Sequence, residues 1–392
     1  MMPRRSRPAG PGLHVDPVLL TDTEVRLGVG DGRDDYEIRY AVSGGRFGRP
    51  ADALVPLLLQ PAMSMGQPVR IPEGVSPRLL GGLDLIQAIF RSWNPRLKPV
   101  PVAAEARDPD VPEGSGVACL FSGGVDSFYT ALKHRDEITH LVFVHGFDID
   151  LADNRRRGAA ISTVREVAER MGKELVEVET NLRSFSDSHA DWILYFGSAM
   201  ASVALLLQRD FRRVFFAAGF AHSDWAQYPP PAGSHPGLDP LWSTEATEIV
   251  HADADATRIE KIQYLADQPL AMDHLLVCYQ GAGEPYNCGR CGKCLRTMTS
   301  LRLVGALERC RTLPDEVDLE AVAAMWDRSG SQPQFIEQNL RLARERDPEL
   351  ARALRSALEG HRLRWEVERW RERGRLARAR VRRTMRQWRL TP

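Results

Sequence analysis

Several features that would assign a protein to a class at once are missing from this sequence. None of its 392 residues belong to an apolar run long enough to span a bilayer, so we do not expect a membrane-spanning segment. Arginines occur among the first 13 residues, but no apolar segment follows them, which argues against a secretory signal. The formal net charge is zero, because 52 lysines and arginines balance 52 aspartates and glutamates. The overall charge therefore indicates no class of partner.

Cysteine is scarce, with six residues in the whole chain. Four of them are clustered: Cys278, Cys288, Cys291 and Cys294. In a chain of this length, such clustering favours a metal site in a reducing compartment over disulfides, so we expect a cytoplasmic protein. Cys119 and Cys310 stand apart, and we expect both to be buried and inert.

The most informative stretch is a turn with two adjacent glycines, SGGVDS at residues 122–127. The apolar run 117–121 predicts a buried parallel strand before it, and residues 126–134 predict a helix after it. Adjacent glycines let the backbone approach a ligand closely and turn its N–H groups into one concavity, which suits phosphate. The helix would add its unpaired N–H groups and the positive end of its dipole. Ser122 and Ser127 can donate hydroxyl hydrogen bonds to the same anion.

Asp126 conflicts with an anion site unless a cation joins it. Mg²⁺ bridging the carboxylate and the phosphate oxygens would resolve the conflict. No Gly-Lys-Ser/Thr follows, so the stretch is not a Walker A loop. A structural turn or another nucleotide loop is the alternative. In motif and in strand–turn–helix context, the stretch resembles the SGGxDS pyrophosphate loop of the N-type ATP pyrophosphatases, a superfamily that binds ATP, adenylates a substrate and releases pyrophosphate.

Strands and helices alternate from residue 115 onward, which implies a parallel sheet covered on both faces. We predict an α/β fold with a doubly wound parallel sheet, and the resemblance implies that it is of the adenine nucleotide alpha hydrolase type. This domain is placed at 115–310. A disordered tail at 1–14 and an α+β subdomain at 15–108 precede it, and a helical, basic extension at 311–392 follows. We expect the subdomain to pack on the core or to assist a homodimer.

Individual elements are predicted from apolar periodicity and turn residues. The expected strands of the core are 117–121, 140–147, 174–180, 213–220 and 245–251, and its helices are 126–134, 157–171, 192–208 and 258–266. The expected strands of the N-terminal part are 23–30, 35–43, 69–71 and 98–104, and its helices are 51–63 and 76–93.

Ligands of open parallel sheets bind beyond the carboxyl ends of the strands. The resemblance implies that Gly146 and Phe147, at the end of the second core strand, contact adenine through backbone groups. Arg258 and Lys261 lie three residues apart on one face of a predicted helix and can reach phosphates, although a solvated face is the alternative. The expected ATP contacts are Phe121, Ser122, Gly123, Gly124, Val125, Asp126, Ser127, Gly146, Phe147 and Arg258. The expected catalytic residues are Ser122, Asp126, Ser127 and Lys261.

The proline-rich stretch 228–240 is too irregular for a helix or strand and is predicted to be a lid or binding loop. Its candidate substrate contacts are His235, Asp239 and the adjoining Trp242, and His222 lies at the neighbouring strand end. A surface connection stiffened by proline is the alternative. For His145 and His222, a structural role is favoured over catalysis, because only their position recommends them.

The four clustered cysteines have the spacing C-x9-C-x2-C-x2-C. Glycines in the short gaps turn the backbone so that neighbouring thiolates converge, and four thiolates without an open position predict structural Zn²⁺. An iron–sulfur cluster and catalytic disulfide chemistry are the alternatives. Arg290, Lys293 and Arg296 would offset the negative charge of the thiolates.

The SGGVDS loop and the four clustered cysteines together resemble those of the 7-cyano-7-deazaguanine synthases, and the resemblance covers residues 117–305. The resemblance implies a C–N bond-forming ligase that uses ATP and Mg²⁺ to adenylate a carboxylate or amide, and then transfers the acyl group to ammonia or an amine. The regions before and after lie outside that pattern, so another small-molecule acyl substrate is equally compatible. A sulfur-transferring enzyme acting on nucleic acid and a non-catalytic nucleotide-binding regulator are the alternatives.

A basic helix is predicted at 361–390. It carries twelve arginines against three glutamates between Arg362 and Arg389, with Trp365, Trp370 and Trp388 interleaved. Such a surface can bind RNA, another polyanion or an anionic membrane surface, so a protein or RNA substrate is an option. A packed or solvated helix is the alternative.

Overall fold

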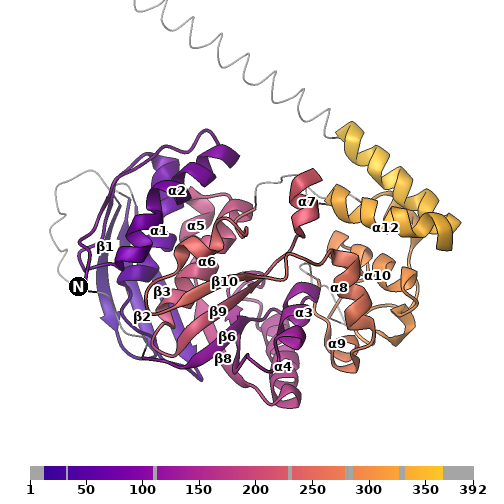
Figure 1. Ribbon diagram of the computed structural model, residues 1–392, viewed down its shortest axis with the longest axis horizontal. Coiled ribbons are helices and arrows are strands. Elements are labelled where there is room, and N and C mark those ends of the chain that lie inside the picture. The colour runs from indigo at the N-terminus through magenta and orange to yellow at the C-terminus, as the bar shows by residue number, and fades with distance from the viewer. Residues whose placement is uncertain are drawn as a thin grey trace, which may run out of the picture.

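The computed structural model describes residues 13–31, 34–108, 113–227, 232–278, 280, 286–325 and 332–364. Across these residues it is an α/β structure built on a mixed sheet of ten strands, in the order β10-β9-β6-β7-β8-β3-β2-β1-β4-β5 (Figure 1). The strands are β1 (Leu13–Leu20), β2 (Glu24–Gly30), β3 (Asp35–Ser43), β4 (Val69–Arg70), β5 (Val102–Ala103), β6 (Gly116–Leu120), β7 (His140–His145), β8 (Glu174–Thr180), β9 (Phe211–Ala217) and β10 (Glu248–Ala252).

Helices connect and cover these strands. They are α1 (Ala51–Met65), α2 (Pro77–Trp93), α3 (Val125–Lys133), α4 (Asn154–Met171), α5 (Arg183–His189), α6 (Trp192–Leu206), α7 (His222–Gln227), α8 (Arg258–Ala266), α9 (Pro269–His274), α10 (Gly292–Leu303), α11 (Leu319–Ala323) and α12 (Gln332–Arg346). A further helix runs from 348 to the last described residue, 364. Among the described residues, no helix combines the length and the apolarity needed to cross a membrane.

The five strands of the predicted core are parallel to one another. From β6 the chain moves outward through β7 and β8, and then returns to the other side of β6 for β9 and β10. The direction of winding therefore reverses between β6 and β9, the kind of switch point at which open α/β sheets bind ligands. The SGGVDS turn leaves β6 at this switch point.

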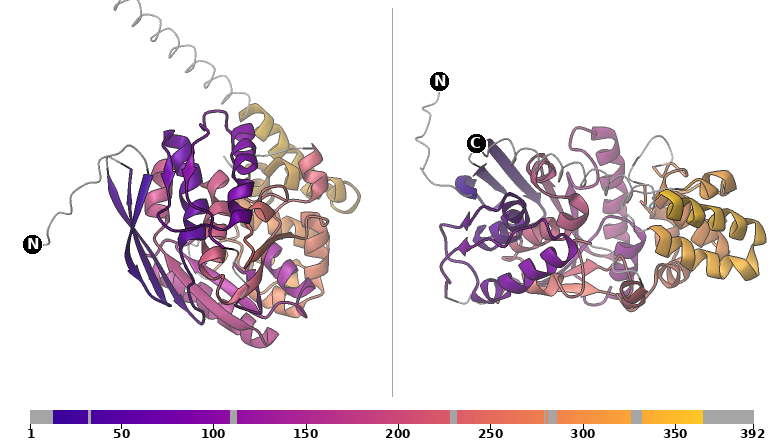
Figure 2. Two further views of the ribbon diagram at one scale, coloured as in Figure 1. Left: turned by 60° about the vertical axis from the view of Figure 1, so that its left-hand side comes forward. Right: turned by 90° about the horizontal axis from the view of Figure 1, so that it is seen from above.

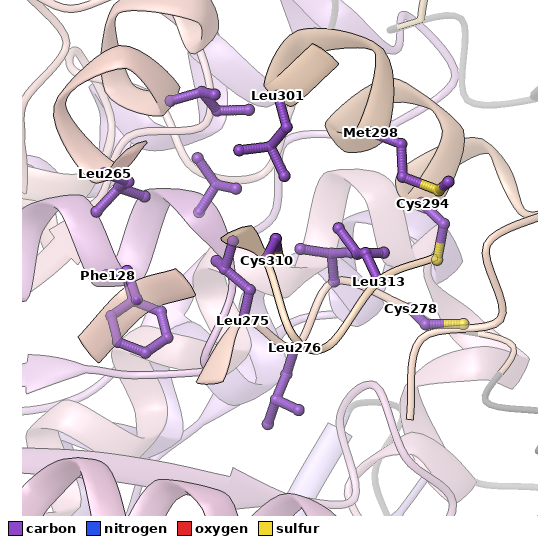
Figure 3. Close-up of a cluster of buried hydrophobic side chains, with 14 of the residues drawn as sticks. Phe128, Leu265, Leu275, Leu276, Cys278, Cys294, Met298, Leu301, Cys310 and Leu313 are labelled. Carbon is purple, nitrogen blue, oxygen red and sulfur yellow. The ribbon is translucent and has the colours of Figure 1, made fainter. Parts of the chain in front are cut away.

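Side chains of the central strand alternate between two hydrophobic clusters, one on each face of the sheet. Cys119 belongs to the cluster made with α3, α4, α8, α9 and α10, part of which is drawn in Figure 3. Ala118 and Leu120 belong to the cluster made with α1, α2, α5 and α6. Burial on both faces explains why the central strand β6 is continuously apolar. β8, in contrast, alternates, with Glu177 and Glu179 between its buried residues.

The N-terminal residues extend this sheet and do not form one of their own. β3 pairs with β8 in antiparallel fashion, with Tyr40 opposite Thr180, and β2 and β1 follow as a meander. This end of the sheet and the C-terminal helices lie at opposite ends of the molecule (Figures 1 and 2). Helix α1 packs on α6, and the Tyr195 hydroxyl donates to the Leu57 carbonyl at 2.7 Å. The subdomain therefore shares the core's hydrophobic interior.

Several expected boundaries shift. Helix α1 continues through Pro56 and Pro61 and ends at Met65, two residues beyond the predicted end at 63. Strand β1 was not predicted, because Pro17 obscures its pattern, and its pairing with β2 shifts register between Pro17 and Leu19. The helix α5 was not predicted either. The predicted basic helix is helical from 361 to 364, and its remainder lies outside the described residues.

Candidate nucleotide and metal sites

The turn after β6 requires glycine at position 123. Gly123 has φ +75°, a left-handed conformation that L-residues with a Cβ adopt at a cost. A Cβ there would also meet the side chain of Leu276 at 3.0 Å. The Gly123 carbonyl accepts a hydrogen bond from the backbone N–H of Leu276 at 2.8 Å. Gly124 then precedes the first turn of α3, whose N–H groups lack helical partners.

The two serine hydroxyls of the turn lie close to each other. Ser127 Oγ donates to the Gly124 carbonyl at 3.0 Å, and Ser122 Oγ lies 3.4 Å from Ser127 Oγ. Phe121 and Val125 have buried side chains, with the Phe121 ring packed edge-to-face on Phe128. The Phe121 N–H already donates to the Val142 carbonyl at 2.8 Å. Val125, in the first turn of α3, can therefore offer a ligand its backbone N–H, whereas the serines can also offer hydroxyls.

Asp126 is held by two cations from α8. Arg258 Nη1 donates to Asp126 Oδ2 at 2.5 Å, and Lys261 Nζ lies 3.5 Å from Oδ1. Lys261 also donates to the Ala218 carbonyl, at the end of β9, at 2.5 Å. The side chains of Arg258 and Lys261 are 6% and 1% exposed, so α8 presents its cations to the sheet and not to solvent. Two cations facing one carboxylate give the cluster a net positive charge.

The protonation of Asp126 reflects a balance between burial and this charge. Burial raises the pKa of Asp126, but the positive charges of Arg258, Lys261 and Arg296 outweigh it and hold the pKa below its ordinary value. Arg296 comes from α10, and its guanidinium lies 4.3 Å from the ring centre of Phe335 in α12. A residue expected only to balance thiolate charge therefore also acts electrostatically on the loop.

The end of β7 is tightly packed. Gly146 has φ +95°, and a Cβ there would lie 1.9 Å from the Thr180 carbonyl oxygen. The Phe147 ring packs on Trp192, and the Phe147 carbonyl accepts a hydrogen bond from Arg183 Nη1 at 3.0 Å. One of the backbone groups expected to contact adenine, the Phe147 carbonyl, therefore already has a protein partner.

Asp239 lies in the interior, which differs from the expectation that it contacts substrate. Its side chain is fully buried, and its carboxylate contacts Ser234 Oγ at 2.6 Å and His251 Nδ1 at 2.7 Å. These contacts tie the segment after 232 to β10. In the structure the Asp239 carboxylate holds Ser234 and His251 together in the interior, and it is not accessible to a ligand.

The rest of the proline-rich stretch is packed as far as it is described. Gly233 contacts Gly197 in α6 so closely that a Cβ on Gly197 would lie 1.7 Å from the Gly233 carbonyl oxygen. His235 lies between the rings of Trp93 and Trp225, and burial lowers its pKa. Trp242 is fully buried as well. Residues 228–231 lie outside the described part of the chain, and His222 begins α7.

The four clustered cysteines converge on one point. Their Sγ atoms all lie within 4.8 Å of one another, and three pairs are separated by 3.5, 3.8 and 3.9 Å. Thiolates about 2.3 Å from a tetrahedral zinc ion stand roughly 3.8 Å apart, so the separations fit such an ion. The four cysteines can hold a metal ion such as zinc. They are Cys278, Cys288, Cys291 and Cys294, and none is in a disulfide.

Two local features bring these cysteines together. Asn287 Oδ1 accepts from the backbone N–H groups of Val277 and Cys278 at 2.9 and 3.0 Å, and its Nδ2 donates to the Leu275 and Thr312 carbonyls. This side chain fixes the distant cysteine beside the other three. Cys291 precedes the first turn of α10, and its N–H donates to Cys288 Sγ at 3.3 Å. The helix dipole there favours thiolate.

Asn287 was not foreseen as a positioning residue, although it directly precedes the first closely spaced cysteine. The contact between Leu276 and Gly123 could not be predicted either, because the two residues are 153 positions apart in the sequence. Cys278 is two residues beyond Leu276, so one of the four clustered cysteines and the residue that contacts the glycine turn lie on one segment of chain. Figure 3 shows Leu276 and Cys278 on this segment, with Cys294 nearby.

Comparison of the sequence with models of protein families and with curated proteins, and of the structure with solved structures, finds no match.

Proposed function

We propose that this protein is an ATP-dependent ligase that releases pyrophosphate and AMP. The observation that supports this most is the position of the SGGVDS turn, at the winding reversal of the parallel sheet and beside the buried cations of α8. Glycine-turn N–H groups, two hydroxyls and two cations form a set of donors suited to the β- and γ-phosphates of ATP.

In this proposal Arg258 and Lys261 exchange partners when nucleotide binds. In the structure both side chains pair with Asp126. A bound phosphate chain would draw them toward its oxygens, and Asp126 would then be free to hold Mg²⁺. The metal, when bound, supplies neutralising charge to the phosphates. The loop amides and hydroxyls stabilise the negative charge that develops on the departing pyrophosphate.

The proposed reaction has two steps. An oxygen of the substrate carboxylate or amide attacks the α-phosphorus, and the bond from that phosphorus to the bridging oxygen of pyrophosphate breaks. An amine or ammonia then attacks the acyl carbon, loses a proton, and expels AMP. The acyl substrate is of the kind used by 7-cyano-7-deazaguanine synthases, or another small carboxylate. Cys119 and Cys310 are both fully buried, so neither supports sulfur transfer.

The cysteine group has a structural role in this proposal, with Zn²⁺ as its metal. Four thiolates leave no open coordination position for a substrate. The ion would instead fix the segment that carries Leu276 and the helix that carries Arg296, both of which act on the loop.

Product analysis tests the ligase assignment. The protein is incubated with α-labelled ATP, Mg²⁺, ammonium and a metabolite extract, and we expect labelled AMP and unlabelled pyrophosphate in equal amounts. Asp126→Asn should lower AMP formation by at least about 100-fold. Asp255→Asn, which changes a carboxylate 70% exposed at the surface, should leave it unchanged. Formation of ADP and phosphate in place of AMP would exclude the scheme.

A nucleotide-binding regulator without turnover is the second candidate. It is favoured by the ion pairs of Asp126, because these give the carboxylate a structural reason to be present even if no metal binds. The same assay separates the two candidates. Saturable binding of Mg·ATP without AMP formation from any extract identifies the regulator.

A further inference from the structure

Helix α12 lies in the C-terminal part of the chain, after the turn and the clustered cysteines. In the structure it packs beside α8 and α10, the helices that carry Arg258 and Arg296 (Figure 1). Its Phe335 is 4% exposed, yet among the described residues it is in neither of the two hydrophobic clusters. The Phe335 ring instead lies beside one aromatic ring and two guanidinium groups.

The Phe335 ring brings together cations from two helices. The central guanidinium carbon of Arg296 lies 4.3 Å from the centre of this ring, and that of Arg258 lies 5.9 Å from it. A cation is attracted to the face of an aromatic ring out to about 6 Å from its centre, so the contact with Arg296 is the stronger of the two. Phe220, which follows β9, stacks on the same ring with 5.4 Å between centres and 17° between planes. One side chain of α12 therefore contacts α8, α10 and the end of β9.

Hydrogen bonds fix the position of α12 on both sides. Asn339 is 2% exposed, and its side chain bonds to the hydroxyls of Thr299 and Ser300 in α10, both at 2.8 Å. Gln338 Nε2 donates to Asp224 Oδ1 in α7 at 2.7 Å. These bonds set the place of the intervening helix surface relative to α10 and to the segment that leaves β9.

The Arg258 guanidinium has few hydrogen bonds to fix it. In the described part of the chain its side chain bonds to Asp126 alone, through Nη1 at 2.5 Å, and its Nε is buried without a hydrogen-bond partner. A phosphate chain that draws Arg258 away from Asp126 would break this one bond. The ring contact would then remain to keep the guanidinium beside the turn. Arg296 acts on the same place, because its positive charge contributes to the lowered pKa of Asp126.

We propose that Phe335 is a positioning residue, whose ring holds the guanidinium groups of Arg296 and Arg258 beside the SGGVDS turn. The C-terminal part of the chain is then required for the geometry of the nucleotide site and is not an accessory to it. The consequence for Mg·ATP binding rests on the proposed function, whereas the action of the ring on the cations does not.

Calorimetric titration of the full chain with Mg·ATP tests the consequence for binding. Phe335→Leu keeps an apolar side chain but removes the ring, and we expect it to lower the affinity about fivefold. Phe335→Tyr keeps the ring and should bind within about twofold of wild type. Leu340→Ala removes apolar volume from the same helix within a hydrophobic cluster, so it should lower the melting temperature and leave the affinity unchanged. Full affinity in Phe335→Leu, or equal weakening in Phe335→Leu and Leu340→Ala, would overturn the proposal.

A double-mutant cycle without nucleotide separates the failure of this proposal from the failure of the proposed function. Urea denaturation measures the shift in midpoint caused by Phe335→Leu in wild type and in Arg296→Met. Because the ring acts on the guanidinium, we expect the shift in the Arg296→Met background to be at most about half of that in wild type. Equal shifts in the two backgrounds would overturn the proposal, whether or not nucleotide binds. A reduced shift in a protein whose wild type binds no Mg·ATP would support the positioning role and contradict the proposed function.

Discussion

The backbone N–H of Leu276 donates to the carbonyl of Gly123 at 2.8 Å, which joins the segment leading to Cys278 to the turn after β6. Cys278 follows two residues later, and Asn287 fixes both Val277 and Cys278 through their N–H groups. The turn therefore contacts a segment that Asn287 fixes and that carries one of the four clustered cysteines. We expect a substitution in the turn or in the cysteine group to affect the other of the two sites.

Replacement of Gly123 should be more harmful than replacement of its neighbour. Gly123→Ala forces alanine into φ +75° and brings its Cβ within 3.0 Å of Leu276, which we expect to cost about 1–2 kcal/mol of unfolding free energy. Gly124→Ala is the matched control, since Gly124 has φ −79° and the nearest atom to a Cβ is 3.3 Å away. Urea denaturation measures both. Equal losses would show that the backbone at 123 is not constrained.

Loss of one cysteine ligand should remove the metal. We expect one zinc ion per chain in the purified protein, and less than a tenth of that in Cys294→Ser. Inductively coupled plasma mass spectrometry measures the zinc content. Removing the ion should lower the melting temperature by at least about 5 °C, because the cysteines close one end of the cluster around α10. Cys119→Ala should retain full zinc content. Metal-free wild-type protein with an unchanged melting temperature after zinc addition would contradict this assignment.

Asp253 should make stability depend on acid pH. It has φ +65°, its side chain is 2% exposed, and its carboxylate accepts from Thr130, Lys133 and His134 at 2.6, 3.0 and 3.0 Å. Burial raises its pKa, but these hydrogen bonds outweigh it and lower the pKa below its ordinary value. A depressed folded-state pKa gives stability that is present above the unfolded value of about 3.9 and is lost as pH falls through the folded value.

The comparison of wild type with Asp253→Asn isolates this contribution, because asparagine tolerates the left-handed backbone. We expect a loss of about 2 kcal/mol at pH 7 that diminishes as pH falls below about 3.9 and through the lowered folded-state pKa, measured by denaturation at each pH. Asp255→Asn, which alters an exposed carboxylate near the same lysine, should change stability little at either pH. A pH-independent difference for Asp253→Asn would contradict the charge-based account.

Local sequence signals predicted the elements that depend on local pattern. The alternation of apolar and polar residues at 35–43 predicted strand β3 with its observed bounds. The spacing of the four cysteines predicted that they converge. Features set by distant partners were not predictable. The pairing of Tyr40 with Thr180 makes one sheet of two expected units, and Asp239 becomes an interior residue only because His251 lies opposite it.

The SGGVDS turn shows the same contrast between features set by local sequence and features set by distant partners. The strand, the turn and the helix around Gly123 follow from the sequence, since each has its own short-range signal. The ion pair between Asp126 and Arg258 does not follow from the sequence, because the two residues are 132 positions apart. The proposed nucleotide site therefore rests on a motif visible in the sequence and on cations that only the fold brings to it.

The central claim is that the turn after β6 and the cations of α8 bind Mg·ATP, and calorimetric titration tests it most directly. We expect saturable binding with one nucleotide per chain, at least tenfold weaker in Arg258→Met, because a charge-assisted hydrogen bond of roughly 1.5–3 kcal/mol is lost. Arg302→Met, which removes a guanidinium of α10 that pairs with Asp347, should bind like wild type. Absence of saturable Mg·ATP binding, or equal weakening in both variants, would contradict the claim.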